Sequence, residues 1–134
     1  MTREIPPNPT VLVVDDEALI RWAISEGLAE AGYPVKLAAS GHEALVALAA
    51  FDEAPLVVIL DLRLPDVADW SLLRQMRIAR PDVPVLVMTA HGSSEDAAEA
   101  LRLGALRFVG KPFDIAQLVH FVTEAWAQTG GGRA

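Results

Sequence analysis

The residues best suited to chemistry are charged or hydroxyl residues that come at the ends of short apolar runs. They are Asp15, Asp16, Asp61, Thr89 and Lys111. Carboxylates brought together without a partner repel one another. A hard divalent cation removes that repulsion, and Mg²⁺ prefers oxygen ligands and keeps several waters, which leaves room for a phosphoryl group. If these five residues converge, their chemistry is that of a magnesium and phosphoryl site.

Each of these residues also has an ordinary structural explanation. Asp15 and Asp16 could cap the following helix and place acid in its first turn. Asp61 could be a loop carboxylate, Thr89 a strand residue, and Lys111 a surface charge before a turn-forming proline. Each explanation is the commoner one for a single residue, but their joint occurrence at four strand ends favours a functional site.

Five short runs rich in Val, Leu and Ile predict five strands. Because these runs are apolar without alternation, they suit strands that are buried on both faces, as in parallel sheets. The runs are Val11–Val14, a weaker one around Val35–Ala39, Leu56–Leu60, Val85–Met88 and a short one at Leu106–Val109.

The segments between these runs carry apolar residues at helical spacing. A Ser-x-x-Glu capping box begins at Ser40, a related Asp-x-x-Gln pattern begins at Asp114, and Ser93 precedes an acidic first turn. Gly32 and Gly104 mark two helix ends. The expected helices run from about Ile20 to Gly32, Ser40 to Phe51, Trp70 to Ala79, Ser93 to Gly104 and Asp114 to Trp126.

Five strand–helix units predict a doubly wound α/β fold, a five-stranded parallel sheet with helices on both faces, because parallel strands need right-handed crossovers. Sites in such sheets lie beyond the carboxyl ends of the strands. We expect one domain over residues 10–128. Residues 1–9 are proline-rich and expected to be extended, and residues 129–134 form a glycine-rich tail or the start of a linker.

Composition excludes several classes of function. The chain has 134 residues, 11 basic and 18 acidic, and a net charge of −7, which argues against a nucleic-acid binder or a basic membrane-surface module. It contains no cysteine, so disulfides, thiolate metal sites and cysteine nucleophiles are excluded. No apolar run approaches the ~20 residues of a membrane span, and no signal peptide is present, so a cytoplasmic location is expected.

The motifs VLVVDDE, VVILDLRLPD, VLVMTAHG and GALRFVGKPFD, in this order and spacing, resemble the receiver domain of two-component response regulators. The resemblance extends from about Thr10 to Trp126 and implies the CheY-like, or flavodoxin-like, form of the doubly wound fold. Within the family, the stretches Ile20–Trp22 and Met88–His91 look like the nitrogen-regulation (NtrC-like, sigma-54-dependent) subfamily.

The resemblance implies a phosphoacceptor site that binds Mg²⁺ or Mn²⁺. Asp61 would be the nucleophile that accepts a phosphoryl group from a phosphohistidine, and because a carboxylate is a weak nucleophile, positioning and charge neutralisation would supply most of the catalysis. Asp16 would ligate the metal directly, and Asp15 would ligate it or hold its waters. Asp61 and the backbone carbonyl of Arg63 would complete the protein ligands.

Other residues would bind the phosphoryl group and respond to it. Lys111 would pair with Asp61 and then with the phosphoryl oxygens, the Thr89 hydroxyl would donate to one of them, and the small Ala90 would leave access. Thr89 and Phe108 would form the switch, with Phe108 rotating into the space that Thr89 vacates. His91, at the mouth of the site, would tune the entry of water, although an exposed loop histidine is an equal interpretation.

The implied partners are a sensor histidine kinase and an output domain or effector that controls transcription. The resemblance implies no turnover of an external substrate, no nucleic-acid contact by this domain and no membrane contact. A face formed by the last two helices and the strand between them would transmit the signal and support a phosphorylation-dependent homodimer. Its residues include Arg102, Arg107, Asp114, His120 and Phe121.

Three rival interpretations stay open at this point. A pseudo-receiver would keep the fold and act as a phosphorylation-independent interaction module, but all the motif residues are present. A haloacid-dehalogenase-like phosphatase needs an aspartate two residues after its nucleophile, where Asp61 is followed by Leu62 and Arg63. A flavodoxin-like flavin binder needs a Ser/Thr/Gly-rich phosphate loop after the first strand, where this chain has three acidic residues.

The chain departs from the family pattern at three positions. Asp69 stands where a glycine is usual, which predicts a shifted or strained loop if that position needs a positive φ. Trp70 is larger than the usual aliphatic residue and is expected to pack on the loop or to join a partner surface. Arg107 replaces the usual aspartate before the switch aromatic.

Overall fold

Five parallel strands form the sheet of the computed structural model, which describes residues 8–51, 54–62, 64, 70–89, 94–110 and 113–129. The strand order is β2-β1-β3-β4-β5, and every pairing is parallel. This order is the doubly wound arrangement that the alternating pattern predicts, so the predicted fold class is confirmed. The strands are β1 Thr10–Val14, β2 Val35–Ala38, β3 Leu56–Asp61, β4 Val85–Thr89 and β5 Arg107–Gly110.

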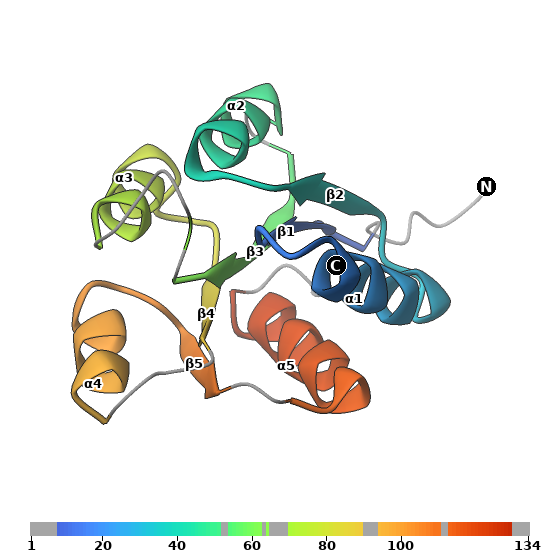
Figure 1. Ribbon diagram of the computed structural model, residues 1–134. Helices are drawn as coiled ribbons and strands as arrows, with labels where there is room; N and C mark the ends of the chain where they lie inside the picture. Colours follow the sequence, from blue (N-terminus) through green and yellow to red (C-terminus); the bar gives the residue numbers. More distant parts are fainter. Residues whose placement is uncertain are drawn as a thin grey trace.

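Helices cover both faces of the sheet, with α1 and α5 on one side and α2, α3 and α4 on the other (Figure 1). Each face has its own apolar core: Ile24, Leu118 and Val122 pack on the α1–α5 side, and Leu48, Leu73 and Met76 pack on the opposite side. The helices are α1 Ala18–Glu30, α2 Gly41–Phe51, α3 Ser71–Ala79, α4 Ser94–Arg102 and α5 Ile115–Gln128.

Polar caps and glycines set several helix ends. Ser40 Oγ accepts the Glu43 N–H at 3.1 Å, and Glu43 reaches back to the Ala39 N–H at 2.8 Å, so the predicted capping box is present with its return bond one residue early. Asp114 accepts the Ala116 N–H at 2.9 Å. Gly104, with φ of +106°, follows α4 in a conformation that favours glycine.

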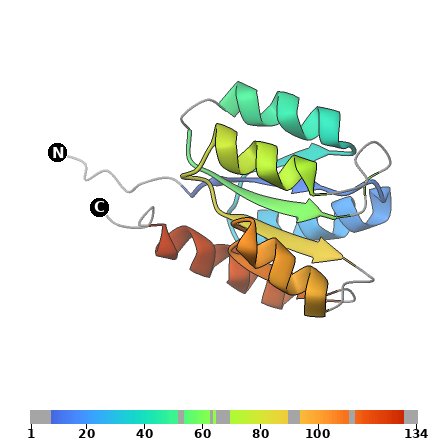
Figure 2. The same cartoon turned by 90° about the vertical axis from the view of Figure 1, so that its left-hand side faces the viewer.

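The register of the strands brings their carboxyl ends to one edge of the sheet. Val14 pairs with Leu60, Asp61 pairs with Met88, and Thr89 pairs with Gly110. The arrowheads of β3 and β4 point to this edge in Figure 2. Within the described part of the chain, no helix has the length and apolar character needed to cross a membrane.

Candidate functional site

Three carboxylates meet at the carboxyl end of the sheet. Asp15, Asp16 and Asp61 each offer an oxygen, and these oxygens all lie within 4.8 Å of one another. Asp15 is fully buried, Asp61 is 4% exposed, and Asp16 is exposed. The cluster therefore combines two buried carboxylates with the exposed carboxylate of Asp16.

The segment between β1 and α1 is held by several hydrogen bonds around Asp15. Its N–H donates to the Ala38 carbonyl at 3.1 Å, and its carboxylate accepts the Glu17 N–H at 2.9 Å. Its carbonyl accepts a bond from Arg21 Nη1 at 2.6 Å. The N-cap of α1 is Glu17, without a side-chain cap bond, so the alternative interpretation of Asp15 and Asp16 as helix caps is wrong.

Asp61 is the last residue of β3 and emerges directly from the core. The five residues before it in β3 are buried, and the following Leu62 N–H donates to the Met88 carbonyl at 3.0 Å, which ties the end of β3 to β4. Burial of the strand thus fixes where the Asp61 carboxylate sits. The resulting donor set consists of carboxylate oxygens, one of them on the exposed Asp16, which fits a hard cation that retains water ligands.

Thr89 and Phe108 lie on the neighbouring strands β4 and β5. Thr89 is 1% exposed at the last position of β4. Phe108 pairs with Val87 in the register of β4 and β5. Phe108 is half-buried and packs against the core beneath α2, α3 and α4. The structure thus places the two predicted switch residues on adjacent strands, two residues out of direct register.

Several predicted site residues lie outside the described part of the chain. These are Arg63, Ala90, His91 and Lys111, together with the departure at Asp69. Trp70, the other departure in that loop, is half-buried and packs against the α2–α4 core, next to the start of α3. That packing accounts for a large aromatic residue at this position.

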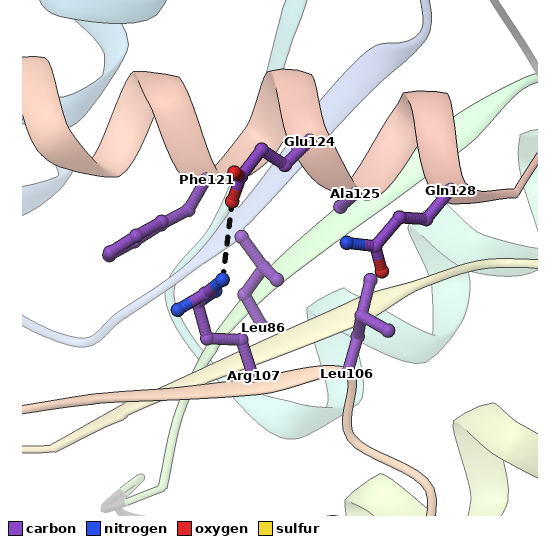
Figure 3. A pocket seen from close by; sticks show the side chains of 7 residues that line it. All are labelled: Leu86, Leu106, Arg107, Phe121, Glu124, Ala125 and Gln128. Carbon is purple, nitrogen blue, oxygen red and sulfur yellow. Dashed lines mark hydrogen bonds and ion pairs between the residues drawn. The ribbon is translucent and has the colours of Figure 1, made fainter.

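A second feature is a small cleft between β5 and α5, which Figure 3 draws from close by. Arg107 Nη2 pairs with Glu124 Oε1 at 3.2 Å, and the Arg107 guanidinium lies 4.1 Å from the centre of the Phe121 ring. His120 Nε2 lies 3.3 Å from the other oxygen of Glu124. Opposite charges therefore meet here. The lining residues are Leu86, Leu106, Arg107, Phe121, Glu124, Ala125 and Gln128.

The remaining residues of the predicted signalling face also have partners on their own elements. Arg102 donates to both carboxylate oxygens of Glu99, at 2.9 and 2.6 Å. The hydrogen bond from Arg102 lowers the pKa of Glu99, and the same bond raises the pKa of Arg102. Arg102 is exposed and Glu99 is half-buried, so this pair is a surface feature of α4.

Two contacts escaped the sequence reasoning. Arg21 belongs to a stretch that indicates only the subfamily and does not predict its bond to Asp15, although its position one turn into the helix after Asp15–Asp16 is a usable signal. Glu124 was also missed as the shared partner of Arg107 and His120. Its spacing of four residues from His120 on one helix face was the available signal.

Comparison with known proteins supports the resemblance. The model of the family described as response regulator receiver domain matches residues 11–123. The DNA-binding transcriptional regulator NtrC of Salmonella typhimurium is 39% identical over 115 residues, which is 86% of this chain and 24% of that protein. This chain therefore spans about a quarter of the length of the NtrC proteins it matches.

Solved structures agree with the fold. A response regulator receiver domain protein from Clostridium thermocellum superimposes with a TM-score of 0.85 at 28% identity, over 91% of this chain and 97% of that one. The receiver domain of NtrX from Brucella abortus superimposes with a TM-score of 0.79 at 34% identity, over 87% and 98% of the two chains.

Proposed function

The chain belongs to the response regulator receiver domain family, and on that premise we propose that it is a phosphoacceptor switch whose acceptor is Asp61. The observation that carries the proposal is the cluster of three carboxylates at the carboxyl end of the sheet. The family membership and the similarity to NtrC support this proposal.

In the proposed reaction, a carboxylate oxygen of Asp61 attacks the phosphorus of a phosphohistidine on a sensor histidine kinase. A phosphorus–oxygen bond forms, the phosphorus–nitrogen bond breaks, and the histidine leaves with the electron pair of that bond. The product is an acyl phosphate on Asp61. Water later hydrolyses this acyl phosphate, which releases inorganic phosphate and restores the Asp61 carboxylate. The chain would thus be a switch, and not an enzyme that turns over an external substrate.

Asp15, Asp16 and Asp61 would hold Mg²⁺ or Mn²⁺, with the Arg63 carbonyl as a further ligand. When bound, the cation neutralises the carboxylates and orients the phosphoryl oxygens. The β1–α1 segment and the end of β3 keep the acidic oxygens together, so the protein provides the site before the phosphoryl donor arrives. Lys111 would bind the phosphoryl group, and the small Ala90 would give access to it. His91 would regulate the entry of water.

Phosphorylation adds about −1.5 to −2 charge and strong acceptor oxygens. The buried Thr89 hydroxyl would donate to one of these oxygens, and Phe108 would turn inward as Thr89 moves. The α4–β5–α5 face would carry the change to an output domain or to a second copy of the chain. We propose that this exchange takes place in the cytoplasm. We also propose that transcription is the output, in line with the similarity to the DNA-binding transcriptional regulator NtrC.

The test is phosphorylation with a small phosphodonor and Mg²⁺, read by intact mass. We expect the chain to gain one phosphoryl group and Asp61→Asn to gain none. Asp82→Asn is the matched control, because it changes the same residue type between α3 and β4, away from the three-carboxylate cluster.

Beryllofluoride with Mg²⁺ gives a second readout through tryptophan fluorescence, since Trp70 packs against the same core as Phe108. A folded parent chain that gains no mass and does not respond to beryllofluoride would overturn the phosphoacceptor proposal. That result would favour a pseudo-receiver that acts through protein contact alone.

A further inference from the structure

Arg21 makes a contact that the proposed reaction does not use. It is the fourth residue of α1, and its side chain turns back toward β1, where Nη1 donates to the Asp15 carbonyl at 2.6 Å. Its own N–H donates to the Glu17 carbonyl at 3.0 Å. The Arg21 side chain therefore connects the first turn of α1 to the segment that carries two of the three clustered carboxylates.

The peptide group between Asp15 and Asp16 determines how both carboxylates are presented. The Asp15 carbonyl belongs to this peptide, so the bond from Arg21 fixes its plane. Asp15 is also held through its N–H and its carboxylate, by Ala38 and Glu17. Asp16 is exposed, and among the described residues none forms a hydrogen bond with its carboxylate. Its direction therefore depends on the backbone that Arg21 holds.

We propose that Arg21 is a positioning residue for the acidic cluster. It acts through the Asp15 carbonyl and keeps the Asp15 and Asp16 carboxylates directed at the place where a divalent cation binds. This inference rests on the proposed function, because it concerns the affinity of the same site for Mg²⁺.

The positive charge of Arg21 supplies a competing explanation, which predicts a change of opposite sign in the affinity for Mg²⁺. A cation near carboxylates reduces their repulsion and competes with a metal ion, so an effect of charge alone predicts that Mg²⁺ binds more tightly after the arginine is removed. Positioning predicts that Mg²⁺ binds more weakly, because the ligands lose their preset direction. The sign of the change in the dissociation constant separates the two.

The experiment is calorimetric titration with magnesium chloride alone on the parent chain, Arg21→Gln and Arg21→Lys. We expect Arg21→Gln to raise the Mg²⁺ dissociation constant about tenfold, the lower end of the range for residues that orient metal ligands. Arg21→Lys keeps a long stem with a terminal donor and is expected to recover most of the affinity. Arg102→Gln, which removes an arginine paired with Glu99 on α4, is the control and should leave the constant unchanged.

Urea unfolding in EDTA supplies the readout for a merely structural role. If Arg21→Gln lowers the unfolding midpoint but binds Mg²⁺ as tightly as the parent, or more tightly, the positioning proposal is overturned. If Arg21→Gln does not fold, Arg21→Met, which keeps the apolar stem and has no donor, replaces it under the same criteria. A parent chain that binds no Mg²⁺ overturns both this inference and the proposed function, whereas a failure confined to the Arg21 variants overturns only this inference.

Discussion

At the carboxyl end of the sheet, three carboxylate oxygens lie within 4.8 Å of one another, whereas at the amino end Arg80 and Asp82 form an ion pair at 2.8 Å. Arg80 precedes β4 and donates to both oxygens of Asp82, at 3.0 and 2.8 Å. It also donates to the Ala54 carbonyl, just before β3, at 3.0 Å. The ion pair thus holds the segment before β4, and the bond to Ala54 connects that segment to the amino end of β3.

The two ends therefore differ in what folding alone accomplishes. At the amino end, the native contacts pair opposite charges, so the contacts contribute to stability without a ligand. At the carboxyl end, folding brings three carboxylates together, and their mutual repulsion lowers stability in a way that a bound cation would relieve. The difference teaches that a stability measurement with and without Mg²⁺ can distinguish a functional cluster from a structural one.

The largest expected effect is that Mg²⁺ reverses the order of stability of the parent chain and Asp16→Asn. In EDTA, Asp16→Asn should raise the free energy of unfolding by about 1 kcal/mol, the scale of one solvent-exposed charge repulsion. With Mg²⁺ at about one hundred times its dissociation constant, the parent should gain about 2.7 kcal/mol and the variant less. Urea unfolding in EDTA and in magnesium chloride measures both values.

Asp15→Asn should also raise the free energy of unfolding in EDTA and gain less from Mg²⁺ than the parent, because an amide oxygen can still accept the Glu17 N–H. Asp82→Asn provides the control, since it should lower stability equally in EDTA and in Mg²⁺. If both cluster variants are less stable than the parent in EDTA, the picture of like charges held together by the fold is wrong.

The β5–α5 cleft gives the second test, because it resembles the amino end in pairing opposite charges. Arg107→Ala removes the contact with Phe121 and the ion pair with Glu124. Both ionic side chains are about 40% exposed, so the expected loss is about 1 kcal/mol, independent of Mg²⁺. A double-mutant cycle with Glu124→Ala separates the ion pair from the ring contact.

A loss at Arg107 that appears only with Mg²⁺ would contradict the separation of the two regions. It would mean that the β5–α5 contacts are coupled to the acidic cluster. Glu99→Ala, which removes the partner of Arg102 on α4, is a suitable control because neither region contains it.

Much of this arrangement could be predicted from the sequence because apolar runs and caps are local signals. The runs before Asp15 and Asp61 predicted the strands, and parallel pairing then required both carboxylates at one edge. The helix caps at Ser40 and Asp114 could also be predicted from their local sequence patterns. Family resemblance supplied the roles, which strand spacing alone cannot assign.

The contacts that escaped prediction depend on side-chain direction. Whether Arg21 points to solvent or back to the Asp15 carbonyl depends on its rotamer, and Arg107 meets Glu124 only because α5 packs across β5. The helix predicted over Trp70–Ala79 begins one residue later, at Ser71, because Trp70 is its N-cap, and it ends at Ala79 as predicted. Long polar side chains have several alternatives of similar energy, which a local pattern does not resolve.

The smallest expected effect is a pH dependence at the amino end. The hydrogen bonds from Arg80 lower the pKa of Asp82 below its ordinary value of 3.8. A carboxyl whose pKa is depressed by folding contributes stability above its unfolded pKa and loses it as the pH falls through the folded pKa. Because Asp82 is 66% exposed, the contribution is a few tenths of a kcal/mol. Asp82→Asn should therefore be slightly less stable than the parent at neutral pH, and the difference should vanish once the pH lies below the folded pKa. Urea unfolding of both proteins across this range measures it, and a difference that grows as the pH falls would show that Asp82 is stabilised by something other than its charge.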